Sequence, residues 1–179
     1  MKSSKKLAIV GLLAALICVA APFSISVGVI PITFATLAIY IVAAVYDYRA
    51  GVIAVLIYIV LGACGVPVFS GFKAGAQVLA GATGGYIVGY VFLALIEGVI
   101  IDKFEDKKFV YPLAMVLGTA VLYAFGTAWF IAIMKTTFVA ALLTCVVPFL
   151  VGDALKIAAA TAISLPLRAA VKKVAVSRV

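Results

Sequence analysis

Long apolar runs interrupted by short basic clusters are the feature that most constrains this chain. Of its 179 residues, 68% are apolar and 11% are charged. A water-soluble fold keeps a largely polar exterior and could not cover this much apolar surface. A spanning helix needs about 20 apolar residues, so the chain has room for about five or six spans and little else. We therefore expect one all-α membrane domain that comprises residues 1–179.

The positions of the charges divide the chain into six expected membrane-spanning helices. We expect these helices over residues 7–21, 33–46, 51–62, 83–101, 111–134 and 149–167. Several of them are short for a full span, which indicates tilt or helix ends that are buried in loops.

The basic residues predict the orientation of the chain. With both termini in the cytoplasm of a bacterial cell, eleven of the 14 Lys and Arg residues face inward, and only Lys73 and Lys135 face outward. Cytoplasmic loops are enriched in basic residues, so the bias favours an even number of spans in a multi-pass protein of the cell membrane. The cytoplasmic set is Lys2, Lys5, Lys6, Arg49, Lys103, Lys107, Lys108, Arg168, Lys172, Lys173 and Arg178.

The residue types that the chain lacks narrow its chemistry. It has no His, and Cys18, Cys64 and Cys145 are scattered without a CxxC pair, so we expect no metal site and no resident cofactor. No GxxxxGK[ST] or GxGxxG-plus-acid pattern occurs, so we expect no nucleotide-binding loop. If the chain belongs to an energised transporter, the energy comes from another subunit.

Glycine is concentrated between the third and fourth expected helices. The stretch GACGVPVFSGFKAGAQVLAGATGGY is too apolar for a solvated loop and too rich in glycine for a good helix. Irregular backbone at membrane depth is tolerated only where protein or a water-filled cavity surrounds it. We interpret the segment as an extracellular lid or re-entrant loop over a pocket. A loosely packed surface connection is the alternative.

Asp153 and Lys156 lie three residues apart in PFLVGDALKIAAA and therefore share one helical face. At 1.5 Å per residue, Lys156 lies roughly 18 Å and Asp153 roughly 22 Å above Arg168. Both would then occupy the outer half of a hydrocarbon core about 30 Å thick, where charged groups are costly and usually face a cavity. A structural ion pair and a ligand contact are both open interpretations, and the two can coexist.

Two further side chains are candidates for function. Glu97 lies one turn above Asp102. We interpret it as an interfacial carboxylate paired with a nearby lysine, with proton coupling as the alternative. Tyr86 directly follows Thr83, Gly84 and Gly85, and it is the best candidate for stacking on a ligand.

The first expected helix carries small residues at helical spacing, Gly11 with Ala15 and Ala14 with Cys18. Such faces allow close helix contact in lipid. They either pack within the protein or dock on another membrane protein.

Four segments of the chain match a known family in order and spacing: PITFATLAIY (31–40), LGACGVPVFSG (61–71), GATGGYIVGY (81–90) and VPFLVGDALK (147–156). They resemble segments of the BioY family, the biotin-binding S components of energy-coupling factor (ECF) transporters. The resemblance implies six helices, cytoplasmic termini, and a vitamin site near the extracellular face under the loop between helices 3 and 4. One departure is Ala35, where family members often carry Gln.

The resemblance also implies which residues bind the vitamin. Asp153 and Lys156 would make polar contacts with biotin, Tyr86 and Phe69 would line the apolar part, and Gln77 would offer an amide to the ureido ring. Thr33, Gly84 and Gly85, from the matching segments, complete the expected substrate-binding set. The docking partners would be a transmembrane coupling subunit and two cytoplasmic ATPases, contacted through helix 1.

We therefore expect a high-affinity biotin-capturing subunit and no enzyme. An S component for another vitamin and a solitary secondary carrier are the nearest alternatives. An intramembrane acyl or lipid transferase is a third, but the sequence shows no nucleophile–base pair or metal set for it.

Overall fold

Most of the chain is helical, which allows an apolar sequence to satisfy its backbone hydrogen bonds in lipid. The computed structural model describes residues 2–25, 29–104 and 107–176. Its elements are α1 (Lys2–Ala20), β1 (Ser24–Ile25), β2 (Ile32–Thr33), α2 (Ala35–Val45), α3 (Tyr48–Ala63), η1 (Ser70–Phe72), α4 (Ala76–Ala80), α5 (Gly84–Lys103), α6 (Val110–Met134), α7 (Phe138–Cys145) and α8 (Val147–Val176).

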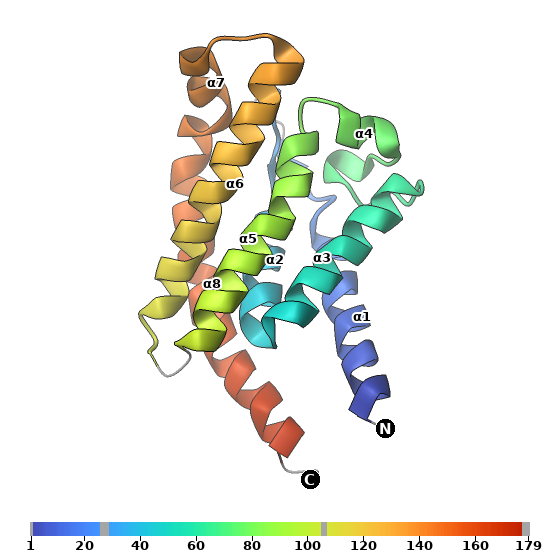
Figure 1. Ribbon diagram of the computed structural model, residues 1–179, viewed down its shortest axis with the longest axis vertical. Helices are drawn as coiled ribbons and strands as arrows, with labels where there is room; N and C mark the ends of the chain where they lie inside the picture. Colours follow the sequence, from blue (N-terminus) through green and yellow to red (C-terminus); the bar gives the residue numbers. More distant parts are fainter. Residues whose placement is uncertain (1, 26–28, 105–106, 177–179) are drawn as a thin grey trace.

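The long helices run antiparallel between two ends of the molecule (Figure 1). Both termini, the α2–α3 turn and the α5–α6 connection lie at one end, which we call the terminal end. The opposite end carries η1, α4 and α7, and we call it the loop end. The connections that are rich in Lys and Arg in the sequence therefore lie at the terminal end, and the connections with few basic residues lie at the loop end.

Three stretches of the described chain are long and apolar enough to cross a membrane. They are α5, α6 and the nearly continuous α7–α8 stretch Phe138–Lys173, while α2 and α3 are apolar but shorter. The all-α class is confirmed. Six spans and cytoplasmic termini stay predictions, and Arg178 of the predicted cytoplasmic set lies outside the described residues.

Helix boundaries depart from the predictions at several places, of which three affect the site. The helix expected over residues 33–46 begins at Ala35, because Thr33 belongs to β2 and pairs with Ser24 of β1 in an antiparallel hairpin. The helix expected over residues 149–167 is α8, which starts at Val147 and continues through Pro166 to Val176. The separate helix α7 precedes it, where no helix was expected. Its first turn is capped by Thr137, whose Oγ1 accepts a hydrogen bond from the amide of Ala140.

A buried arginine ties four helices together at the terminal end. Arg168 of α8 donates from Nη1 to the carbonyl oxygens of Ala44 and Tyr46, both at 2.8 Å. Its Nη2 lies 2.7 Å from Oδ1 of Asp102 on α5, and the other carboxylate oxygen accepts the amide of Tyr48, which starts α3. The guanidinium thus satisfies carbonyl groups at the end of α2, where a cation is favoured. This cluster fixes α2, α3, α5 and α8 relative to one another.

Large apolar side chains cover much of the outer surface. Leu7, Leu12, Val151 and Leu155 are each more than two-thirds exposed. In water such a surface would drive association, whereas in a bilayer it faces lipid at no cost. The external surface therefore agrees with a membrane-embedded protein.

Candidate functional site

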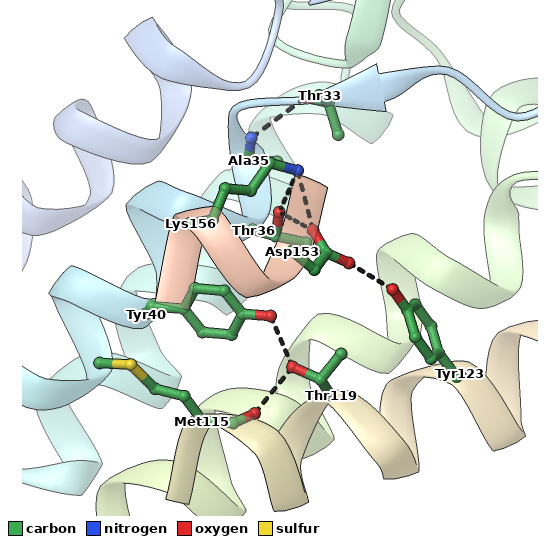
Figure 2. A network of polar contacts seen from close by, with 9 residues as sticks. All are labelled: Thr33, Ala35, Thr36, Tyr40, Met115, Thr119, Tyr123, Asp153 and Lys156. Carbon is green, nitrogen blue, oxygen red and sulfur yellow. Dashed lines mark hydrogen bonds and ion pairs between the residues drawn. The ribbon is translucent and has the colours of Figure 1, made fainter. Parts of the chain in front are cut away.

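Asp153 and Lys156 form a buried ion pair near the loop end of α8. Nζ of Lys156 lies 2.9 Å from Oδ1 of Asp153, and the two side chains are 12% and 6% exposed. Thr36 of α2 accepts a hydrogen bond from Nζ of Lys156 at 3.0 Å. Tyr123 of α6 donates to Oδ2 of Asp153 at 2.5 Å. Figure 2 shows α2, α6 and α8 converging on this pair.

An uncharged hydrogen-bonded layer lies beside the ion pair (Figure 2). The hydroxyl of Thr119 donates to the carbonyl oxygen of Met115 at 2.7 Å, so it accepts the hydroxyl hydrogen of Tyr40 at 2.5 Å. Tyr40 comes from α2 and Thr119 from α6. Because buried polar groups are costly when they lack partners, this pairing favours one relative position of the two helices.

Thr33 fixes the hairpin to the start of α2. Its Oγ1 donates to the carbonyl oxygen of Ala21 at 2.7 Å and accepts the amide hydrogen of Ala35 at 3.1 Å. This local pattern is a common way for a threonine to begin a helix. Thr33 lines the site, and its hydroxyl already has both a donor and an acceptor partner.

The ring of Tyr86 is held in place by α6 and α7. Its hydroxyl lies 3.1 Å from Oγ1 of Thr127 and 3.4 Å from the carbonyl oxygen of Cys145. The ring packs directly on Gly126, where a Cβ atom would come within 2.5 Å of it. The close approach therefore requires glycine at position 126, and it orients the aromatic face that the sequence predicted as a stacking surface.

The glycine-rich segment 64–83 is anchored and does not form a loose surface connection. Phe69 is fully buried and packs edge-on against Tyr58 of α3, with ring centroids 5.6 Å apart. The amide of Gly71 donates to the carbonyl oxygen of Pro22 at 2.9 Å, which joins the segment to the end of the turn after α1. These contacts support the interpretation of the segment as a cover over a pocket.

Gly84 and Gly85 allow the end of this cover to pack closely. A Cβ on Gly84 would lie 1.7 Å from the carbonyl oxygen of Leu79, and one on Gly85 would lie 2.2 Å from Cβ of Trp129. The indole of Trp129 donates to the carbonyl oxygen of Gly81 at 3.0 Å. The two glycines thus contribute to close packing, and neither lines either of the two cavities described below.

Two adjoining cavities lie beneath the hairpin and the segment 64–83. The first, which we call the loop cavity, includes Phe69, Ser70, Lys73 and Thr83 in its lining. The second, the ion-pair cavity, includes Thr36, Tyr123, Asp153 and Lys156. Both are also lined by Ile30, Pro31, Thr33, Tyr86 and Tyr90, so they are parts of one site.

The cavities are small in this structure. Their volumes are about 60 Å³ and about 40 Å³. Small-molecule pockets usually measure about 300–1,000 Å³. The two cavities are therefore smaller than a ligand of vitamin size needs, and the residues around them would have to rearrange to admit one.

Gln77 and the small residues of α1 differ from the predicted arrangement. Gln77 lines neither cavity; its side chain is exposed and its amide donates to the carbonyl oxygen of Ala74 at 2.9 Å.

On α1, Gly11 and Ala15 are exposed, whereas Ala14 is buried in the core and Cys18 is partly buried against it. Of the predicted docking set, only Gly11 and Ala15 form a face that a partner can reach.

Three polar residues that line the site are not among the predicted substrate-binding residues. Thr36 lies one helical turn after Thr33 and looks like an ordinary helix residue, and Tyr90 lies one turn after Tyr86. Tyr123 lies on α6, and no local pattern marks it as a site residue. Helical spacing from Tyr86 would have identified Tyr90 on α5, whereas only the packing of α6 against α8 brings Tyr123 to Asp153.

Glu97 is fully buried in α5 and is not an interfacial group. Neither carboxyl oxygen has a hydrogen-bond partner among the described residues. The predicted pairing with a nearby lysine is therefore wrong, because α5 turns this side chain into the bundle. Proton coupling through Glu97 stays a prediction.

The polar groups around the two cavities suit an organic ligand. They comprise hydroxyls, one carboxylate and two lysines, which together can accept and donate hydrogen bonds. Among the described residues there is no group of three His, Cys, Asp or Glu side chains placed to hold a metal ion. The geometry can bind, orient and desolvate a partly polar molecule.

Relatives cover nearly the whole chain. A family model described as the BioY family matches residues 1–173. The chain is 37% identical over 158 residues to a protein named biotin transporter BioY from Thermotoga maritima. This alignment covers 88% of this chain and 92% of the relative. The chain is also 34% identical over 161 residues to a protein named probable biotin transporter BioY from Pyrococcus horikoshii. This second alignment covers 90% of this chain and 94% of the relative.

A solved structure shares the fold. It is described as the crystal structure of the S-component for biotin from an ECF-type ABC transporter, and it superposes with a TM-score of 0.84. The superposition covers 93% of this chain and 92% of the other at 22% sequence identity, so it is evidence of fold alone. The family match and the two relatives carry the assignment further: the chain belongs to the BioY family.

Proposed function

We propose that the protein captures biotin at its loop end and serves as the S component of an ECF-type importer in a bacterial cell membrane. The observation that carries the proposal is the buried Asp153–Lys156 pair, which lines a cavity under the hairpin and the segment 64–83. The membership of the BioY family and the relatives named as biotin transporters support it. Relatives of this kind are transporters and not enzymes.

The chemistry of biotin matches the lining of the two cavities. Its fused ring system offers two N–H donors and one carbonyl acceptor. The carboxylate of Asp153 can accept from an N–H group, and the ammonium of Lys156 can donate to the carbonyl oxygen. The apolar thioether ring suits the aromatic surfaces of Phe69, Tyr86 and Tyr90, which line the loop cavity.

Uptake would require the cover to open and a second protein to supply energy. The small volumes of the two cavities support an opening step in which the hairpin or the segment 64–83 moves before biotin enters. For release inside the cell, the protein would dock through Gly11 and Ala15 of α1 on a transmembrane coupling subunit that carries two cytoplasmic ATPases. Loss of uptake in cells without these subunits supports this partnership, whereas persistent uptake indicates a solitary carrier.

Binding of biotin to the purified protein tests the substrate directly. Isothermal titration in detergent should detect binding by the unmodified protein. The variants Asp153→Asn and Lys156→Met should each bind at least about tenfold more weakly, because each removes a hydrogen bond to a charged group. Arg49→Gln, at an exposed position at the terminal end, is the matched control and should bind normally. A correctly folded protein without measurable affinity for biotin would exclude the substrate.

A further inference from the structure

The loop cavity contains a lysine to which no role has yet been given. Lys73 follows η1, is exposed to solvent and lines the loop cavity. Among the described residues no carboxylate forms an ion pair with it. Lys156 also lines the site, but Asp153 already neutralises it at 2.9 Å. Lys73 is therefore the uncompensated positive charge of the site.

Ser70 provides a second group with unused bonding capacity in the same cavity. Its hydroxyl oxygen is shielded from solvent and has no hydrogen-bond partner among the described residues. Ser70 lines the loop cavity together with Lys73. Because buried polar atoms are almost always paired in folded proteins, an unpaired hydroxyl facing a cavity points to a ligand atom as its partner.

The ion-pair cavity is a poor place for a second negative charge. Lys156 and Asp153 together are neutral, and Tyr123 also donates to the carboxylate. A ligand carboxylate placed there would lie close to Asp153 in a medium of low dielectric constant, where like charges repel strongly. At the loop cavity the same carboxylate would meet Lys73 and would keep part of its hydration.

We propose that Lys73 and Ser70 form the subsite for the carboxylate of the ligand, while the uncharged ring binds at Asp153 and Lys156. This inference rests on the proposed function, because it takes biotin as the ligand. The two cavities share lining residues, so one molecule can extend through both. The carboxylate accepts hydrogen bonds from the ammonium of Lys73 and the hydroxyl of Ser70.

The affinities of biotin and biotinamide, in which a neutral carboxamide replaces the carboxylate, test this subsite. The unmodified protein should prefer biotin by about tenfold, the factor expected for one hydrogen bond to a charged group. Lys73→Gln should remove most of this preference, leaving only the part that Ser70 supplies, and should leave the affinity for biotinamide unchanged. Lys73→Arg should retain a preference for biotin, and Ser70→Ala should reduce it. Lys135→Gln, a second basic position at the loop end that lines neither cavity, is the control for general electrostatic attraction and should keep the full preference.

The possible results separate this inference from the proposed function. If the unmodified protein binds neither compound, the proposed function fails and the subsite fails with it. If it binds biotin but Lys73→Gln keeps the unmodified preference, the subsite alone is overturned. If Lys135→Gln loses the preference for biotin over biotinamide as fully as Lys73→Gln does, the subsite is also overturned, because the preference would then come from the overall charge of the protein.

Discussion

Tyr123 of α6 donates its hydroxyl hydrogen to Oδ2 of Asp153 on α8 across 2.5 Å. The two residues are 30 positions apart in the sequence, and nothing in their local patterns links them. The bond means that the charge predicted to contact the ligand is also part of the contact between two helices. Changes at this point should therefore affect stability as well as binding.

Replacing Tyr123 with Phe should lower the free energy of unfolding by about 1.5–3 kcal/mol, because the buried carboxylate of Asp153 loses a hydrogen bond to a charged acceptor. Thermal unfolding of the purified protein in detergent would measure the change. Tyr46→Phe is the matched control, since the hydroxyl of Tyr46 makes no hydrogen bond among the described residues. Equal unfolding midpoints for the two variants would contradict the role of Tyr123.

Arg168→Met should destabilise the protein by about 3–5 kcal/mol, because it removes the cation that pairs with Oδ1 of Asp102 and the donor to the carbonyl groups at the end of α2. Lys6→Gln breaks the ion pair with Asp47, whose two side chains are 41% and 38% exposed, and should cost less than about 1 kcal/mol. Denaturant or thermal unfolding of both variants provides the comparison. A smaller loss of stability for Arg168→Met than for Lys6→Gln would show that burial does not determine how much each ion pair contributes to the free energy of unfolding.

The positions of the long helices could be predicted because charges bound the apolar runs. The helices expected over residues 83–101 and 111–134 correspond to α5 and α6 almost residue for residue. Charge also predicted the separation between the terminal end and the loop end. In contrast, α7 and the β1–β2 hairpin are short and lie between apolar runs, where periodicity and hydropathy carry little information.

The candidate site was predictable only where one helix supplies both partners. Asp153 and Lys156 are on one face of α8, and their spacing is enough to bring them together. The partners that complete the site come from other helices, and their approach depends on tertiary packing. Glu97 was predicted to lie at the membrane–water interface from its distance to Asp102. That distance gives the depth of a residue along the helix, but not the direction in which its side chain points.

Gly84→Ala and Gly85→Ala should each destabilise the cover of the site, because the added Cβ would lie 1.7 Å from the carbonyl oxygen of Leu79 or 2.2 Å from Cβ of Trp129. We expect a loss of about 1–3 kcal/mol, typical of overpacking, in thermal unfolding experiments. Gly152→Ala in α8 is the control, since no atom lies within 4 Å of its Cβ position. It should be neutral or slightly stabilising, as alanine favours helix. A loss at Gly152→Ala as large as the losses at Gly84→Ala and Gly85→Ala would contradict the role of close packing, because helix propensity alone favours alanine.

Glu97→Met should raise the free energy of unfolding by about 1–3 kcal/mol, because it removes buried carboxyl oxygens that have no partner among the described residues. The measurement is again the unfolding midpoint in detergent, together with the affinity for biotin, which should not change. Glu97→Gln keeps the shape and a polar end, so it should gain less stability than Glu97→Met. A loss of stability in both variants would show that the carboxyl group has a partner.

Bulky residues on the exposed face of α1 should separate binding from transport. Gly11 and Ala15 are exposed, and no atom lies within 4 Å of the Cβ position of Gly11, so Gly11→Leu with Ala15→Leu should leave the fold and biotin affinity intact. If this face docks on a coupling subunit, the larger side chains prevent close helix contact and reduce biotin uptake by cells. Ala158→Leu, on an exposed face of α8, adds similar bulk elsewhere and should leave uptake unchanged. Undiminished uptake in the α1 double variant, with the protein present at normal levels in the membrane, would place the docking surface on another helix.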